Sequence, residues 1–155
     1  MFNIPFSPPD ITQNEIDEVI EVLKSGWITT GPKTKLFENR VASMCHTKKA
    51  VCLSSQTVCA EMTLRLLGIG VGDEVIVPAY TYTASASVIC HVGATPVLID
   101  CAENGFEMDY DKLKDAINEK TKAVIAVDLA GRVCDNDKIF QAVDEKRSLF
   151  TPGDN

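Results

Sequence analysis

The sequence has few of the residues that mark metal sites. It contains two histidines, His46 and His91, and none of its six cysteines forms a Cys-x-x-Cys pair. The ligand spacing of a structural zinc site is therefore missing, and we predict no metal site. Cys52, Cys59 and Cys90 lie in apolar runs, where a thiol behaves as a small apolar side chain. We expect reduced, buried cysteines rather than a disulfide framework.

Positive charge is also scarce. Lys and Arg number 15 against 22 Asp and Glu, which leaves a net charge of −7. Nucleic acids and anionic membranes need a basic face, so we predict neither as a partner. A small phosphate is still compatible, because backbone N–H groups at a helix start can bind it. No signal peptide and no apolar run of membrane-spanning length is visible, so we expect a cytoplasmic protein.

The rest of the sequence alternates short apolar runs with segments of helical periodicity. Hydrophobic residues make up 45% of the chain, enough for one domain with a core. This alternation predicts the α/β class, with a mostly parallel sheet covered by helices on both faces. We expect strands at 50–54, 74–78, 96–100 and 122–128, and helices at 12–25, around 37–44, and at 57–67, 82–91, 110–118 and 135–146. Residues 147–155 read as a loop, which is typical of an interrupted domain.

The predicted turn from the first strand into a helix contains Ser55, Gln56 and Thr57. Ligands of open α/β sheets bind beyond the carboxyl ends of strands, and a helix start offers free N–H groups and a positive dipole end. The turn could therefore hold a phosphate without a basic side chain. Alternatively, Ser55 or Thr57 simply caps the helix, and the residues alone favour this simpler role.

Two further strand ends carry residues of interest. Tyr80 and Tyr82 follow the second strand and could stack on a flat heteroaromatic ligand, although the residues alone slightly favour ordinary core and rim packing. Asp128 ends the last strand, where it could face a pocket or, as we favour, bind the following turn. The glycines from Gly68 to Gly72 follow a helix and precede a strand, which excludes a dinucleotide-binding fingerprint.

Several motifs in register resemble the sugar aminotransferases of the DegT/DnrJ/EryC1/StrS family. The resemblance runs from about Ile4 to about Val143, and the loop at 26–32 is similar to that of the enzymes making UDP-4-amino-4-deoxy-L-arabinose. The motifs that carry it are Gly26–Pro32, Phe37-Glu38, Ser55–Thr57, Leu67–Pro78, Thr81-Tyr82, Gly93-Ala94 and Asp100.

The resemblance implies the N-terminal part of a fold-type-I transferase that uses pyridoxal 5'-phosphate (PLP) and works as a homodimer. Residues 1–32 would be an N-terminal helix and substrate loop, and residues 33–155 an incomplete PLP-binding large domain. The phosphate would lie against the turn and the pyridine ring against a tyrosine, with the sugar nucleotide near the loop. The implied cofactor residues are Ser55, Gln56, Thr57, Val58 and Tyr82, and the implied substrate residues are Trp27, Thr29 and Thr30.

Three departures from the family pattern bear on activity. Gln56 stands where the family commonly has Gly or Ala, and Asp128 where many relatives have His. The Schiff-base lysine and the Asp that pairs with the pyridine nitrogen lie beyond the matched region. We therefore assign no catalytic residue to this chain, and expect it to bind PLP weakly at best and not to turn over alone.

The resemblance implies that the intact enzyme transfers an amino group from glutamate, giving 2-oxoglutarate, to a keto-sugar linked to UDP or dTDP. Such amino sugars serve polysaccharide or lipopolysaccharide biosynthesis. Two alternatives stay open. The chain could be a non-catalytic module that pairs with a full-length paralogue or a separate C-terminal half, or part of a PLP-dependent sugar dehydratase of the same family.

Overall fold

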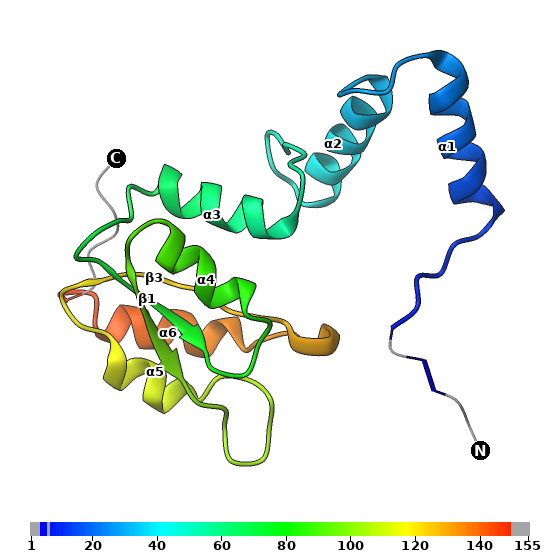
Figure 1. Ribbon diagram of the computed structural model, residues 1–155. Coiled ribbons are helices and arrows are strands. Elements are labelled where there is room, and N and C mark those ends of the chain that lie inside the picture. The colour runs from blue at the N-terminus through cyan, green and yellow to red at the C-terminus, as the bar shows by residue number, and fades with distance from the viewer. Residues whose placement is uncertain (1–3, 6, 150–155) are drawn as a thin grey trace. The chain divides into compact units, whose positions relative to one another are not determined.

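The computed structural model describes residues 4–5 and 7–149, arranged in two compact units, Met1–Cys52 and Leu53–Asn155 (Figure 1). Residues 150–155 of the predicted terminal loop lie outside the described residues. The boundary expected after residue 32 stays a prediction. In the described part of the chain no helix is both long enough and apolar enough to cross a membrane.

The first unit contains the helices α1 (Gln13–Ser25) and α2 (Pro32–Met44). The predicted capping box begins α1: the Glu15 carboxylate accepts the Thr12 N–H at 2.6 Å, and the Thr12 hydroxyl accepts the Asn14 N–H. Gly26 ends the helix in the left-handed conformation at φ 72°. The structure of α1 depends on these local signals, because none of its residues is buried. In α2 the one buried residue is Ala42.

The second unit is built on a parallel sheet of three strands, in the order β2-β1-β3. The central strand is β1 (Glu74–Pro78), flanked by β2 (Thr95–Ile99) and β3 (Thr121–Val124). The other elements are α3 (Gln56–Leu66), α4 (Ala84–His91), α5 (Tyr110–Ala116), the 3₁₀ helix η1 (Leu129–Gly131) and α6 (Asn136–Glu145).

Helices cover both faces of this sheet, as predicted. Successive β1 side chains point to opposite faces, so Val75 and Val77 belong to one core cluster and Ile76 to the other. The first cluster includes Leu64 of α3 and Val88 and Ile89 of α4. The second includes Leu113 of α5 and Ile139 and Ala142 of α6. The α/β class and the two covered faces are therefore confirmed.

The strand expected at residues 50–54 is wrong. This segment has no regular secondary structure, and Val51 is 70% exposed. An apolar run becomes a strand only when a neighbouring strand accepts and donates its hydrogen bonds, and the described part of the sheet places none beside it. The Cys52 N–H is bound instead by the Glu38 carboxylate at 3.0 Å.

The cysteines are free, as expected for reduced thiols, but most of them are not buried. Cys134 is buried, whereas Cys45, Cys52 and Cys90 are exposed. The expectation of buried cysteines was wrong because apolar neighbours in sequence do not place a side chain on the inward face. Cys90 adjoins the buried Ile89 on α4 yet points outward.

A charged cluster joins α3 to the end of α4. The Glu61 carboxylate accepts from the Arg65 guanidinium at 2.8 Å and lies 3.0 Å from His91 Nδ1. The hydrogen bond from Arg65 makes the largest contribution, and the contact with His91 the next largest, to lowering the pKa of Glu61 below its ordinary value. The stabilisation from this ionised carboxylate is present above the ordinary carboxyl pKa and is lost as pH falls through the lowered one.

We predict that Leu113→Ala lowers the free energy of unfolding by about 2–5 kcal/mol, because it leaves a cavity at a fully buried position. Leu98→Ala, at a 59% exposed position of edge strand β2, should cost about 1 kcal/mol or less. Urea unfolding, monitored by circular dichroism, compares the free energies of unfolding of the two variants. Equal losses would contradict the assignment of Leu113 to the core.

We also predict that Arg65→Met raises the pKa of Glu61, because it removes the main hydrogen-bond donor to the carboxylate. A carbon-detected NMR titration of the glutamate side chains measures this change. Lys35→Met, which removes a charge from the other unit, is the matched control and should leave Glu61 unchanged. An unaltered Glu61 titration in Arg65→Met would show that His91 alone holds the carboxylate.

Candidate functional site

The sheet topology predicts a ligand site at the carboxyl edge of the second unit. The chain passes from central β1 to β2 and then returns past β1 to β3. The intervening helices α4 and α5 pack on opposite faces of the sheet. A change of direction of this kind opens a crevice beyond the carboxyl ends of the strands, where open α/β folds bind ligands. The segments after Pro78 and Val124 follow the two strands, β1 and β3, between which the topology predicts this site.

Helix α3 begins near the same edge. Residues 67–73 link its last turn directly to the amino end of β1, and α3 packs along α4, as Figure 1 shows. Its first turn is therefore directed toward the carboxyl edge. The Ser55 hydroxyl accepts the Val58 N–H at 3.2 Å, so Ser55 is the cap that the sequence favoured.

Two N–H groups remain at this helix start. The N–H groups of Gln56 and Thr57 meet no acceptor in the described part of the chain. Thr57 is half-buried and Gln56 is exposed, while residues 53–60 contain no Lys or Arg. Free donors at the positive end of a helix suit an oxyanion. Val58 suits it less, because its N–H is already bound to Ser55. Phosphate binding here stays a prediction.

The structure separates the two candidate tyrosines. The Tyr80 ring packs against Phe106, with centroids 5.7 Å apart and planes at 28°. Tyr82 lies just before α4, and its side chain is 81% exposed. Phe106 occupies one face of the Tyr80 ring, whereas the more exposed Tyr82 ring has no aromatic partner among the described residues and is the freer of the two for a planar ligand.

Asp128 binds a turn, as the sequence favoured. Its carboxylate accepts the Cys134 N–H at 2.9 Å and closes the loop that contains η1. Within that loop Ala130 and Gly131 have φ of 53° and 79°, a conformation that a side-chain acceptor helps to hold. The described residues contain no cluster of His, Cys, Asp or Glu that could hold a metal ion.

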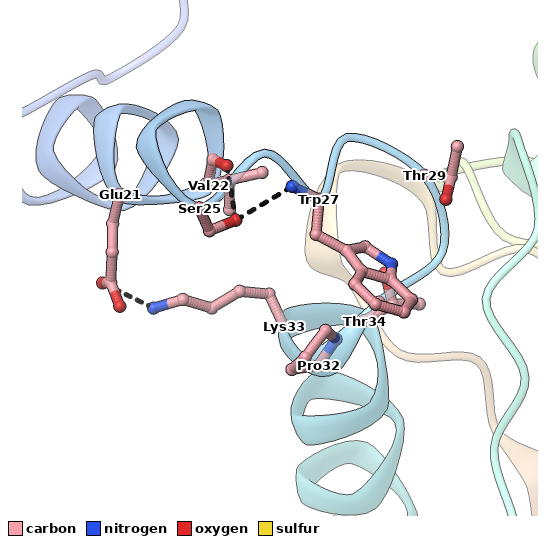
Figure 2. A pocket seen from close by; sticks show the side chains of 9 residues that line it. Glu21, Val22, Ser25, Trp27, Thr29, Pro32, Lys33 and Thr34 are labelled. Atoms are coloured by element: carbon pink, nitrogen blue, oxygen red, sulfur yellow. Dashed lines mark hydrogen bonds and ion pairs between the residues drawn. The ribbon is translucent and has the colours of Figure 1, made fainter.

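The loop between α1 and α2 forms a second candidate site, a groove within the first unit (Figure 2). The Trp27 indole N–H donates to the Thr30 carbonyl at 3.0 Å, and the Trp27 backbone N–H donates to the Ser25 hydroxyl at 3.1 Å. The groove has a volume of about 400 Å³. Its lining residues are Glu21, Val22, Ser25, Trp27, Thr29, Gly31, Pro32, Lys33 and Thr34.

The groove brings together part of the predicted substrate set. Trp27 and Thr29 line it, whereas Thr30 contributes its carbonyl to the indole. Lys33 and Thr34 also line the groove, although they were not identified from the sequence. The available signal was Pro32, a residue typical of the first helical position, which places Lys33 and Thr34 in the first turn of α2 beside the loop.

Lys33 is held by two glutamates of α1. Its ammonium lies 2.5 Å from the Glu18 carboxylate and 2.8 Å from that of Glu21. The hydrogen bond to Glu18 is the largest cause, and that to Glu21 the next, of the raised pKa of Lys33. The lysine is therefore charged and forms ion pairs with both glutamates.

The fold is that of an α/β protein with a parallel sheet between two helical layers, and its similarity to known proteins identifies the family. The chain belongs to the DegT/DnrJ/EryC1/StrS aminotransferase family, whose sequence model matches residues 9–150. It is 43% identical over 147 residues to the spore coat polysaccharide biosynthesis protein SpsC of Bacillus subtilis (strain 168). That alignment covers 95% of this chain and 38% of SpsC.

Solved structures agree with this assignment. "Putative sugar aminotransferase Spr1654 from Streptococcus pneumoniae", known in PLP, PMP and apo forms, is 60% identical with a TM-score of 0.93. The match covers 99% of this chain and 39% of that one. A GDP-4-keto-6-deoxymannose-3-dehydratase is 26% identical with a TM-score of 0.83, over 91% of this chain and 38% of that one. The chain thus spans about two fifths of these relatives.

We predict that Gly31→Ala displaces the indole of Trp27. The backbone at Gly31, with φ of −142°, suits any residue, but an added Cβ would lie 2.2 Å from Trp27 Cδ1. Because Trp27 is the only tryptophan, its fluorescence emission should change. Gly70→Ala, whose nearest neighbour would be 3.6 Å away, is the matched control. Identical emission from the unsubstituted protein, Gly31→Ala and Gly70→Ala would contradict the close contact between Gly31 and the indole.

Proposed function

We propose that this chain supplies the phosphate-binding and ring-binding part of a PLP-dependent sugar aminotransferase. Two findings support it: membership of the family over residues 9–150, and the structural match to a protein known in a PLP form. The observation that carries the proposal is the pair of unpartnered N–H groups of Gln56 and Thr57 at the start of α3.

The residues present fit a pyridoxal phosphate. Ser55 keeps the helix end formed, which leaves the N–H groups of Gln56 and Thr57 and the Thr57 hydroxyl for the phosphate oxygens. The exposed ring of Tyr82 would lie against the pyridine ring. When bound, PLP supplies the electron sink that amino-group transfer requires.

In its intact form we propose that the enzyme takes the amino group from glutamate, releases 2-oxoglutarate, and delivers the amino group to a nucleotide-linked keto-sugar. The groove of Trp27 and Thr29, with Thr30 behind the indole, would be part of the sugar-nucleotide site. We further propose a homodimer in the cytoplasm, where the six free cysteines would stay reduced.

A second candidate reaction is dehydration of the sugar. It is supported by the structural match to a GDP-4-keto-6-deoxymannose-3-dehydratase, which is weaker in identity than the match to the aminotransferase. Isotope labelling of the intact enzyme's reaction distinguishes the two. With ¹⁵N-glutamate, an aminotransferase places the label in the sugar product, whereas a dehydratase yields a deoxy sugar without it.

We predict that PLP and inorganic phosphate, but not pyridoxal, shift the backbone amide signals of Gln56 and Thr57 in a ¹⁵N NMR titration. Thr57→Val should weaken PLP binding by roughly fivefold, the value of one hydrogen bond of about 1 kcal/mol. Thr63→Val, whose hydroxyl donates to the Cys59 carbonyl within the same helix, is the matched control. Shifts of equal size with pyridoxal, or confined to other residues, would overturn the phosphate assignment.

A further inference from the structure

The indole of Trp27 is held in place by its edge, while the ring itself stays accessible. Its N–H is bound to the Thr30 carbonyl at 3.0 Å, and its five-membered ring lies against Gly31. The side chain nevertheless remains 56% exposed and lines the groove. A fixed, partly exposed aromatic ring whose hydrogen-bond donor is already satisfied offers stacking as its remaining interaction.

The charges around the groove disfavour an anion. Lys33 is the cation among the lining residues, and its ammonium is bound to both Glu18 and Glu21. These three side chains together carry a charge of −1, and the Glu21 carboxylate itself lines the groove. A diphosphate would therefore meet net negative charge, or would have to separate Lys33 from its partners.

The polar groups that remain suit an uncharged ring. Thr29 and Thr34 line the groove, and within the described residues their hydroxyls make no hydrogen bond. A hydroxyl both donates and accepts, so it can meet the alternating carbonyl and N–H groups on the edge of a nucleobase. The groove volume of about 400 Å³ is within the range of small-molecule sites.

We propose that this groove binds the nucleobase of the sugar nucleotide, by stacking on Trp27 and by hydrogen bonds to Thr29 and Thr34, and that it does not bind the diphosphate. The inference rests on the proposed function for its substrate class. It adds Thr34 to the substrate residues and assigns Lys33 a structural role, as a bridge from α2 to the glutamates of α1.

The test is a fluorescence titration, because stacking quenches indole emission and Trp27 is the only tryptophan in the chain. The probes are uridine, UDP and inorganic pyrophosphate, each at low and high salt. We expect uridine and UDP to quench with Kd values within about threefold of each other and little salt dependence. Pyrophosphate should neither quench nor displace uridine.

Two results would overturn the inference. One is UDP binding more than about thirtyfold tighter than uridine with a steep loss in high salt, which would place the diphosphate in the groove. The other is the absence of quenching by uridine at millimolar concentration. In either case the amide shifts of Gln56 and Thr57 with PLP report separately on the proposed function, so failure of one is distinguishable from failure of the other.

Variants assign the hydrogen bonds. Thr34→Val should weaken uridine binding by about three- to tenfold, without changing the emission of the free protein. Thr47→Val, whose hydroxyl donates to the Lys49 carbonyl elsewhere in the same unit, is the matched control and should bind uridine normally. Unchanged affinity in Thr34→Val would remove that residue from the site. Calorimetry with Trp27→Phe, which keeps an aromatic ring, should show weakened rather than abolished binding.

Discussion

Strand β1 carries three consecutive side chains, Val75, Ile76 and Val77, that are completely buried. Burial on both faces requires a helical layer on each side, and α3 with α4 and α5 with α6 provide these layers. A central parallel strand also needs a partner on each edge, which β2 and β3 supply. The chain therefore leaves β1 for β2 and crosses back past β1 once to reach β3, and this change of direction predicts a ligand site at the carboxyl edge.

The two candidate sites use different physical means. At the start of α3 the attraction for an anion comes from backbone groups, whose direction follows from the helix and needs no basic side chain. In the groove of the first unit, side chains determine what can bind: a positioned indole, a charged lysine paired with two glutamates, and threonine hydroxyls. The proposed phosphate and nucleobase functions follow from this contrast, because residues 53–60 contain no Lys or Arg and leave backbone N–H groups as the phosphate donors at the start of α3.

The fold class could be predicted because its signals are local. Apolar runs and helical periodicity indicate β1 and its covering helices, and the capping box of Thr12 and Glu15 marks the start of α1. The strand at 50–54 could not be judged in this way, since pairing depends on a segment distant in sequence. The same holds for Tyr80 and Tyr82: only the position of Phe106, more than twenty residues away in the sequence, shows which ring is occupied.

Of the candidate sites, the helix start was predictable and the groove was only partly so. Ser55 followed by Thr57 is a recognisable cap, and its role could be read from residue type. The sequence around Lys33 does not indicate its ion-pair partners, because Glu18 and Glu21 lie one helix earlier and contact it only through space.

Helix α1 is held by its ends and by Lys33 rather than by burial, because none of its residues is buried. Its apolar stripe of Ile16, Val19, Ile20 and Leu23 is exposed although its backbone is already ordered. A surface that is ordered in advance loses little conformational entropy when it is covered. Burial of this stripe against another apolar surface would therefore keep most of its hydrophobic free energy as binding affinity, in contrast to a segment that must fold as it binds.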